Sequence, residues 1–264
     1  MAAGLAAGGR MAQLWIVGLL MMLQALWSPM GVAALPAHAT FYGGSDASGT
    51  NNGACGYSNV LSTPFGTMTA ALSSPLFNEG LSCGSCYKVR CSGSSTGGCI
   101  DNEIMVTATN LCPHGSEGGW CDGKPHFDMS QPAFSQIAKP VAGVVEVEYT
   151  KVPCPRKGGM QFTVMGHTYF LQVLIFNVGG SGDVTAVKVR GGNGEWIAMT
   201  RSWGQLWQTG KVLDGQALSF QVTTSNGKTC VSNYVAGSHW KYGQTFEGSH
   251  LSLHRCLSGG HVEN

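Results

Sequence analysis

Charged residues are scarce in this chain of 264 residues. Only 11% of the residues are Asp, Glu, Lys or Arg, and the formal net charge is +1 at pH 7. A balance so close to zero provides no strong field for binding nucleic acid or an anionic membrane surface. Because of this charge balance, we expect no nucleic-acid partner. The chain also lacks an Asn-x-Ser/Thr sequon, so N-glycosylation is not expected.

Long apolar runs are lacking after the first 35 residues. The run from Leu14 to Trp27 follows Arg10 and is closed by small residues and Pro36. This pattern predicts a secretory signal peptide over residues 1–34, and the alternative is a signal anchor that stays in the membrane. The run is short for a membrane span, which favours cleavage. We expect a secreted, extracellular protein without stable membrane insertion.

Motifs for metal or redox chemistry are nearly absent. Cys83-Gly-Ser-Cys86 is not followed by a second C-x-x-C or by a pair of histidines that would complete a zinc site. No thioredoxin-like βαβ pattern surrounds it. The eight histidines are scattered without the spacing of metal ligands. The sequence therefore predicts no metal and no cofactor.

Glycine and cysteine are the residues that the chain does have in unusual numbers. There are 39 glycines and ten cysteines, and every cysteine follows the expected signal peptide. An even number of cysteines in a secreted chain indicates disulfides. The high glycine content with few charges is typical of a β-rich protein with many turns.

The cysteines and the charges both divide the chain in two. Eight of the ten cysteines lie within 55–154. Residues 38–154 carry nine acidic and five basic side chains, whereas the rest carries five acidic and nine basic ones. The short segment 152–159, rich in Pro, Gly and basic residues, joins the two regions. We expect domains at 38–154 and 160–249 that pack against each other, and a C-terminal tail at 250–264.

Short strand patterns fill both domains. In the first, one or two short helices fit near 67–72 and 130–138, and a disulfide-stapled barrel of mixed strands is expected. In the second, Gly, Asn-Gly and Asp-Gly turns separate the strands, which predicts a β-sandwich. The expected strands are 40–42, 86–91, 103–109 and 143–149, then 160–164, 169–176, 184–190, 196–199, 218–223 and 229–232.

Asp128 is the first candidate for a functional residue. Ser130 and Pro132 have the pattern of a helix start, so Asp128 is expected where a strand or loop meets a helix N-terminus. A carboxylate at that position can cap the helix. It can also face a cleft as a functional acid. The residues alone leave both interpretations open.

Seven motifs occur in a characteristic order along the chain. Together they resemble the plant expansins, with the α-type as the best fit, from His38 to about Ser249. The motifs are His38-Ala-Thr-Phe-Tyr-Gly-Gly44, Asn52-Gly-Ala-Cys-Gly-Tyr57, Gly80-Leu-Ser-Cys-Gly-Ser-Cys86, Val106-Thr-Ala-Thr-Asn110, His126-Phe-Asp128, Val178-Gly-Gly180 and Trp203-Gly-Gln-Leu-Trp207.

The resemblance implies a fold and a function. The fold is mainly all-β, with a six-stranded double-psi β-barrel followed by an immunoglobulin-like β-sandwich that binds carbohydrate. The function is non-hydrolytic, acid-dependent loosening and extension of the plant cell wall by a protein located there. The expected partners are cellulose and the matrix polysaccharides of the wall, and the protein is expected to be a monomer.

The barrel is similar to that of an inverting endoglucanase family, whose reaction needs two carboxylates. Asp128 matches the general acid, but Gly43 stands where the base is expected after Tyr42, and Asp46 lies further on. Asn110 carries an amide, which cannot act as a base. This chain therefore has a match for only one of the two carboxylates that inverting hydrolysis needs. The alternatives are an inverting endo-β-1,4-glucanase with an unrecognised base and a purely carbohydrate-binding wall protein.

The remaining site residues also follow from the resemblance. Thr40, Tyr42, Asn110 and His126 are expected to line a polysaccharide groove beside Asp128. We hypothesise that acid activates the protein because only a neutral Asp128 carboxyl can donate a hydrogen bond. Flat aromatic side chains of the second domain would bind sugar rings. The candidates are Tyr169, Phe170, Trp203 and Trp207, of which Trp207 could lie at the surface or in the core.

The resemblance further implies three disulfides in the first domain. They are Cys55–Cys83, Cys86–Cys154 and Cys91–Cys99, which leaves Cys112 and Cys121 to pair with each other. Cys230 and Cys256 depart from the usual pattern of the family. A bridge between them would fix the tail, and the alternatives are free thiols or an intermolecular bond.

Overall fold

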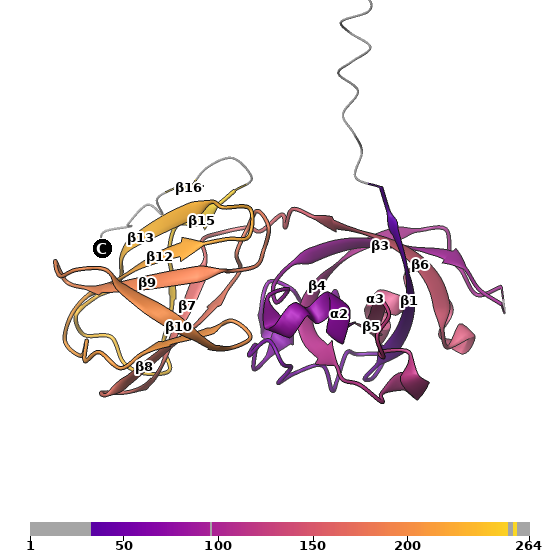
Figure 1. Ribbon diagram of the computed structural model, residues 1–264, viewed down its shortest axis with the longest axis horizontal. Coiled ribbons are helices and arrows are strands. Elements are labelled where there is room, and N and C mark those ends of the chain that lie inside the picture. Colours follow the sequence, from indigo (N-terminus) through magenta and orange to yellow (C-terminus); the bar gives the residue numbers. More distant parts are fainter. Residues whose placement is uncertain (1–32, 96, 253–255, 258–264) are drawn as a thin grey trace, which may run out of the picture. The chain divides into compact units, whose positions relative to one another are not determined.

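The computed structural model of this protein describes residues 33–95, 97–252 and 256–257. The expected signal peptide therefore lies almost entirely outside the described residues, and so does most of the expected C-terminal tail. Within these ranges, no helix has both the length and the apolar character needed to cross a membrane. Strands dominate the described part of the chain (Figure 1).

The first region closes into a six-stranded barrel in the order β1-β5-β2-β4-β3-β6. The pairs β1–β5 and β2–β4 are parallel, and the other neighbours are antiparallel. The strands are β1 (Leu35–Tyr42), β2 (Thr69–Ser73), β3 (Cys86–Gly93), β4 (Glu103–Cys112), β5 (His126–Ser130) and β6 (Val145–Val152). This arrangement confirms the expected barrel of mixed strands, which are the indigo to pink ribbons of Figure 1.

One of the two expected helices in the barrel is absent, and the other is present but shorter than the expected segment. The segment expected as a helix near 67–72 contains strand β2, all five residues of which are buried between β5 and β4. Tertiary pairing has overridden the helix propensity of Ala70 and Ala71. The second helix is only α3 (Gln131–Phe134), followed by turns. The other helical segments are equally short: α2 (Ser74–Phe77) and the 3-10 turns η1 (Val60–Ser62), η2 (Asn78–Gly80), η3 (Glu117–Gly119) and η4 (Pro140–Ala142).

The residue that caps α3 is Ser130. Its hydroxyl accepts a hydrogen bond from the backbone N–H of Ala133 at 3.3 Å, and Pro132 occupies the first turn. Asp128 lies two residues earlier, inside β5. The interpretation of Asp128 as the helix cap is therefore wrong, because the cap position belongs to a residue at the end of the strand.

The second region forms eight strands in the order β13-β12-β9-β10-β11-β8-β7-β14. Its core lies between the strands and includes Phe162 and Phe220, whose rings stack 4.6 Å apart. The sequence missed β11, which returns from the tight turn at Gly204 and Gln205. The strands are β7 (Gln161–His167), β8 (Phe170–Phe176), β9 (Ala186–Gly191), β10 (Ile197–Trp203), β11 (Leu206–Thr209), β12 (Leu218–Thr223), β13 (Thr229–Ala236) and β14 (Thr245–Glu247).

All ten cysteines are paired, and all five expected pairings are confirmed. Four bridges lie in the barrel region, and the fifth joins β13 to the tail. There, β15 (His250–Leu251) and β16 (Cys256–Leu257) form a small separate sheet. The pairs are Cys55–Cys83, Cys86–Cys154, Cys91–Cys99, Cys112–Cys121 and Cys230–Cys256. The tail bridge is therefore intramolecular.

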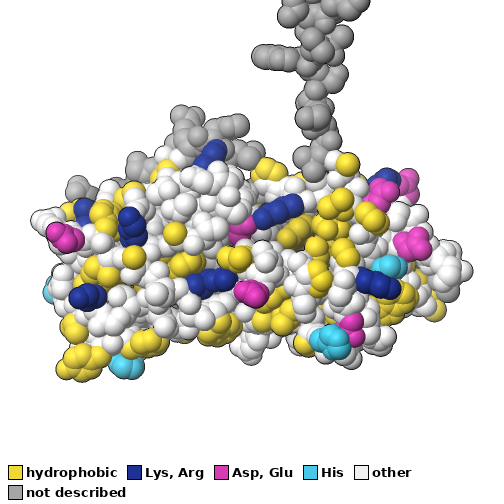
Figure 2. Space-filling model, in the orientation of Figure 1, with side chains coloured by type: hydrophobic (Ala, Val, Ile, Leu, Met, Phe, Trp, Pro, Cys, Tyr) yellow, Lys and Arg dark blue, Asp and Glu magenta, His cyan; other side chains and the backbone are white. Residues whose placement is uncertain are grey.

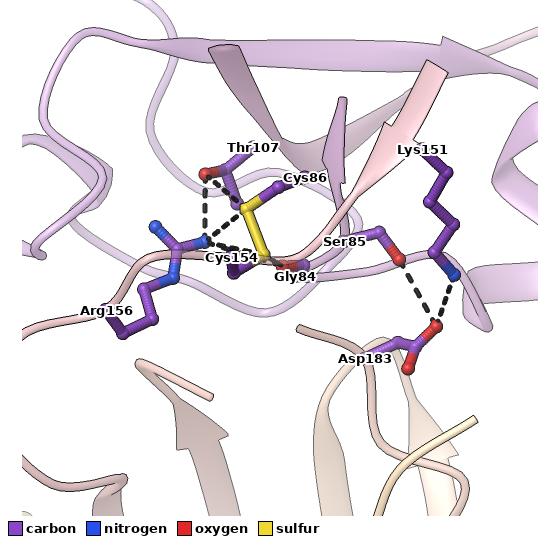
Figure 3. The surroundings of a disulfide bond; sticks show 8 residues. All are labelled: Gly84, Ser85, Cys86, Thr107, Lys151, Cys154, Arg156 and Asp183. Atoms are coloured by element: carbon purple, nitrogen blue, oxygen red, sulfur yellow. Dashed lines mark hydrogen bonds and ion pairs between the residues drawn. A yellow bond between two sulfur atoms is a disulfide. The ribbon is translucent and has the colours of Figure 1, made fainter. Parts of the chain in front are cut away.

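Buried polar contacts join the barrel to the sandwich near the Cys86–Cys154 bridge (Figure 3). Asp183 of the sandwich, only 2% exposed, accepts hydrogen bonds from Lys151 Nζ at 2.6 Å and from Ser85 Oγ at 3.3 Å, both in the barrel region. A side chain at Gly182 would approach the carbonyl oxygen of Gly84 to 2.3 Å, so only glycine permits this backbone contact. The two regions pack directly, as the short linker predicts.

Charged side chains are sparse on the protein surface. On the face shown in Figure 2, basic and acidic groups are scattered among apolar and uncharged side chains, without a continuous patch of one sign. This distribution follows from the low charged fraction of the sequence.

Candidate functional site

The parallel pairing of β1 with β5 builds the candidate site in the barrel. Its register places Thr40 opposite Asp128 and His38 opposite His126. Because side chains alternate along a strand, His126 and Asp128 lie on the face of β5 opposite to Phe127, which is in the core. The Thr40 hydroxyl donates to Asp128 Oδ1 at 2.9 Å and lies 2.8 Å from His126 Nε2.

These three side chains are well shielded from solvent. Thr40 and Asp128 are each 6% exposed, and His126 is 0% exposed. The expected role of His126 in lining a groove therefore needs correction, because a side chain without exposed surface cannot contact a polysaccharide directly. The buried His126 ring instead forms a hydrogen bond with the Thr40 hydroxyl through its Nε2.

The ionisation of His126 is strongly disfavoured. Burial, together with the charge of nearby His38, lowers its pKa to about 4. Its Nδ1 is buried and has no hydrogen-bond partner among the described residues. The ring is consequently neutral over most of the acidic range. A neutral imidazole has one donor and one acceptor nitrogen, so its Nε2 can either donate to Thr40 or accept from it.

Tyr42 and Asn110 complete the cluster around Asp128. Burial raises the pKa of the Tyr42 phenol, the neighbouring Asn110 side chain opposes this shift, and the charge of Asp128 adds to it. Asn110 Oδ1 is held by the backbone N–H groups of Ala54 at 2.7 Å and Leu111 at 2.8 Å. The expected residues Thr40, Tyr42, Asn110 and Asp128 are thus brought together in the fold.

Two residues that sequence reasoning did not propose for the site lie beside this cluster: Trp120, in the loop before β5, and His38, on β1. The Trp120 ring packs against His38, with ring centroids 4.7 Å apart. The Cys112–Cys121 bridge at the same loop packs with Ala71 and Tyr42. The loop therefore contacts both ends of the row His38–Thr40–Tyr42 on β1. The i, i+2 spacing of His38 and Thr40 was the signal in the sequence that could have indicated a role for His38.

The aromatic candidates of the sandwich differ in exposure. Tyr169, in the turn between β7 and β8, is 75% exposed, and Trp203, at the end of β10, is 51% exposed. They lie near opposite ends of β11, a strand of four residues that spans roughly 13 Å. Phe170 is half-buried on the outward side of β8, next to His167.

The assignment of Trp207 to the carbohydrate-binding surface is wrong. Trp207 is 4% exposed and belongs to the core of the sandwich. It pairs with Val173 across β8 and β11, so it shares the inward face of the sheet. Its spacing of four residues from Trp203 does not place both on one surface, because the chain reverses at Gly204 between the two strands.

Metal coordination is not supported among the described residues. No group of three or more His, Cys, Asp or Glu side chains in the described ranges is arranged to hold a metal ion. The site that the described residues do form consists of one carboxyl group with hydroxyl, phenol, amide and imidazole neighbours. Such a site can exchange hydrogen bonds with a hydroxyl-rich ligand.

Comparisons with known proteins match both halves of this chain. The Expansin C-terminal domain family matches residues 160–237, and a double-psi β-barrel family described as Lytic transglycolase matches residues 69–149. A crystal structure of apo Clavibacter michiganensis expansin aligns with a TM-score of 0.65 at 21% identity, covering 84% of this chain and 99% of that chain. A mutant of that protein in complex with cellohexaose aligns with a TM-score of 0.64. These matches confirm the expected barrel and sandwich.

Plant relatives are much more similar in sequence. Expansin-A13 of Oryza sativa subsp. japonica is 48% identical over 219 residues, covering 80% of this chain and 84% of that protein. Expansin-A23 of Arabidopsis thaliana is 46% identical over 214 residues, covering 80% of this chain and 78% of that protein. With this identity along most of both chains, and with both halves matched by family comparisons, the chain belongs to the expansin family and is of the α-expansin type.

Proposed function

We propose that this protein is secreted to the plant cell wall and there disrupts non-covalent contacts between cellulose and matrix glucans, without hydrolysis and in response to acid. Its membership in the α-expansins implies cell wall loosening. The structural relative from Clavibacter was crystallised with cellohexaose, which supports cellulose as a partner. The finer mechanism rests on the site itself.

The observation that carries the proposal is the environment of Asp128. Its barrel neighbours are a hydroxyl, a phenol and an amide, and the position expected for the hydrolytic base is occupied by Gly43. Gly43 has a φ of +75°, and a Cβ there would lie 2.4 Å from the carbonyl oxygen of Ser48. A carboxylate side chain at this position would therefore require the loop to rearrange.

Asp46 is poorly suited to replace the missing base. Its Oδ1 accepts a hydrogen bond from the backbone N–H of Ser48 at 2.9 Å, within its own exposed loop. Hydrogen bonds from Ser48 lower the pKa of Asp46. A carboxylate with a lowered pKa is a weaker general base, since catalysis by a base is most effective when its pKa lies near the working pH.

A change in the protonation of Asp128 would reverse the hydrogen bonds of the cluster. When Asp128 is ionised, it can only accept, and Thr40 donates to it. When Asp128 is neutral, it can donate either to Thr40 or to a glucan hydroxyl. Thr40 has a single hydroxyl hydrogen, so it would then be free to turn toward His126 Nε2. Acid would in this way convert Asp128 from an acceptor into a donor.

The sandwich would hold the protein on the polysaccharide while the barrel acts. Tyr169 and Trp203 present exposed rings, and aromatic rings stack on the apolar faces of sugars. Gln172 and Gln208 pair between these two residues and are only partly buried. Their amides can bond sugar hydroxyls along the same strip.

The decisive experiment measures the extension of isolated, heat-killed plant wall under load across a series of pH values. We expect wild-type protein to extend the wall in acid and to release no reducing ends from soluble glucan. Asp128→Ala should be inactive at every pH. Asp128→Asn should keep activity but lose the acid dependence, because an amide donates at any pH. Asp46→Asn is the matched control and should behave as wild type.

Each other outcome contradicts a specific part of the proposal. An Asp128→Asn variant that is inactive at every pH would contradict the neutral-donor mechanism. Release of reducing ends that Asp46→Asn abolishes would identify an endoglucanase with Asp46 as its base. Binding to the wall without any extension would identify a purely carbohydrate-binding protein.

A further inference from the structure

A second cluster of aromatic and polar side chains lies on sandwich strands that carry neither Tyr169 nor Trp203. Strands β9, β12 and β13 are neighbours in the sheet (Figure 1). The cluster combines the end of β9, the β9–β10 hairpin and β13. We call it the Arg190 surface, and it consists of Arg190, Asn193, Trp196, Asn233 and Tyr234.

Tyr234 is presented by an irregular and strained part of β13. Leu218 pairs with Ala236 and Phe220 pairs with Ser232, so three residues of β13 bulge opposite Ser219. Tyr234, in the middle of the bulge, has a φ of +48°, which is unfavourable for a bulky side chain. Bulges of this kind redirect a side chain, and strained positions are frequent at functional sites.

Hydrogen bonds hold Tyr234 in this strained position. Its backbone N–H donates to Ser219 Oγ at 2.9 Å, and its phenol donates to Asn193 Oδ1 at 2.7 Å. The side chain is nevertheless 44% exposed. The fold thus keeps an aromatic ring at the surface in one orientation, although its burial contributes little to the core.

Among the described residues, Arg190 has no carboxylate partner. Its guanidinium lies 4.7 Å from the centroid of the Trp196 ring, and its Nη2 donates to Asn233 Oδ1 at 3.1 Å. No ion pair of the described residues includes Arg190, and exposed Glu195 of the same hairpin is not within ion-pair distance. Lys188, also exposed, points outward two residues earlier on β9.

We propose that the Arg190 surface binds uronate residues of an acidic polysaccharide. The Nε of Arg190 is buried, so its terminal Nη atoms are the donors that can bond a carboxylate, and the guanidinium packs over the Trp196 ring. The exposed Tyr234 ring offers an apolar face to the sugar, and the amides of Asn193 and Asn233 lie beside it to bond sugar hydroxyls. A neutral glucan would leave the cation without a counter-charge, so an acidic sugar fits the surface better.

The basic balance of the sandwich half agrees with this assignment. The chain after Cys154 carries nine Lys or Arg and five Asp or Glu residues. The Arg190 surface shares no residue with the Asp128 cluster or with Tyr169 and Trp203. The inference therefore stands independently of the proposed wall-loosening mechanism, and wall extension need not change when this surface is altered.

The test compares the affinity of the full-length protein for oligogalacturonate and for cellohexaose by titration calorimetry at low salt. We expect Arg190→Gln and Tyr234→Asn each to weaken oligogalacturonate binding roughly tenfold, as the loss of a charged hydrogen bond or a stacked ring does. Asparagine tolerates a positive φ, so Tyr234→Asn should fold at least as stably as wild type. Lys139→Gln, which removes an exposed cation of the barrel region, is the matched control for Arg190→Gln and should leave oligogalacturonate binding unchanged.

Three results would overturn the inference. One is wild-type protein that binds oligogalacturonate no more tightly than cellohexaose. The second is unchanged oligogalacturonate affinity in Tyr234→Asn, a variant whose folding a melting curve verifies. The third is an equal loss in Lys188→Gln and Arg190→Gln with none in Tyr234→Asn, because that pattern indicates non-specific attraction of charge rather than a built site.

Discussion

The barrel and the sandwich place their functional side chains in opposite environments. In the barrel, Thr40, His126 and Asp128 are at most 6% exposed and bond mainly to one another. In the sandwich, Tyr169 and Trp203 are 75% and 51% exposed. A buried carboxyl responds to protonation and to geometry, whereas an exposed ring provides contact area. The first arrangement suits a switch, and the second suits attachment.

The disulfides are also distributed unevenly between the barrel and the sandwich. Four disulfides lie in the barrel region, and the sandwich has one, which fixes the tail to β13. The barrel must hold polar groups of β1, β4 and β5 within hydrogen-bond distance, and bridges such as Cys112–Cys121 lie directly against Tyr42. The exposed rings of the sandwich need only the rigid strands beneath them.

The largest expected effect is a loss of stability that should distinguish substitution of Trp207 from substitution of Trp203, both in the sandwich. Trp207→Ala should lower the free energy of unfolding by about 3–5 kcal/mol, because it empties a core position. Trp203→Ala should leave stability nearly unchanged but weaken binding to cellulose roughly tenfold. Denaturant melts and binding isotherms on both variants measure these effects. Equal stability losses would show that Trp203 also serves the core.

A smaller effect tests the buried polar cluster of the barrel. The pKa of His126 is lowered to about 4 from 6.5, so between these values the unfolded chain binds a proton that the folded protein does not. Stability should therefore fall as the pH decreases from 6.5 to 4, by up to about 3 kcal/mol from this residue. His126→Gln removes the titrating group.

Urea melts at several pH values compare wild type with His126→Gln. The variant should lose less stability than wild type on acidification through this window, even if it is less stable at neutral pH. Tyr169→Ala, far from any titrating histidine of the cluster, is the control and should follow the wild-type profile. If the free energy of unfolding depends on pH in the same way in wild type and in His126→Gln, then protonation of His126 does not destabilise the folded protein.

The smallest effect concerns the contact between the two regions. Burial alone would raise the pKa of Asp183, but the hydrogen bond and charge of Lys151, with Ser225 and Ser181, lower it overall. Asp183→Asn should cost about 1–2 kcal/mol, since Lys151 is 41% exposed and water replaces much of the lost interaction. The stability that Asp183 contributes is present above the unfolded pKa and is lost as the pH falls through the lowered one.

Calorimetry of Asp183→Asn should also show whether the two regions unfold together. We expect the single transition of the wild type to broaden or divide, because the buried contact links barrel and sandwich. Glu103→Gln removes the exposed Lys88–Glu103 pair, whose 2.6 Å distance equals that of the Lys151–Asp183 pair, and should change little. If Glu103→Gln has the same effect, burial is not what makes Asp183 important.

The strands of the barrel show where sequence patterns fail. β3, β4 and β6 contain alternating or apolar runs that identify them directly. β2 is short and rich in alanine, and β5 is the short segment His126-Phe-Asp-Met-Ser130, whose alternation extends over only five residues. As in any closed barrel, both are paired on each side, and this backbone pairing compensates for weak local preference. Local patterns cannot report that compensation.

The sequence by itself determined the division into two β-rich regions and the even number of cysteines, and its resemblance to the expansins supplied the disulfide pairing and the candidates Thr40, Tyr42, Asn110 and Asp128. Order, spacing and residue type carry that information because they persist along the chain. Only the tertiary structure decided that His126 is buried behind Thr40, that Trp207 belongs to the core, and that Tyr234 is turned outward. Exposure depends on which strands pair and which faces pack, and these contacts join residues far apart in the sequence.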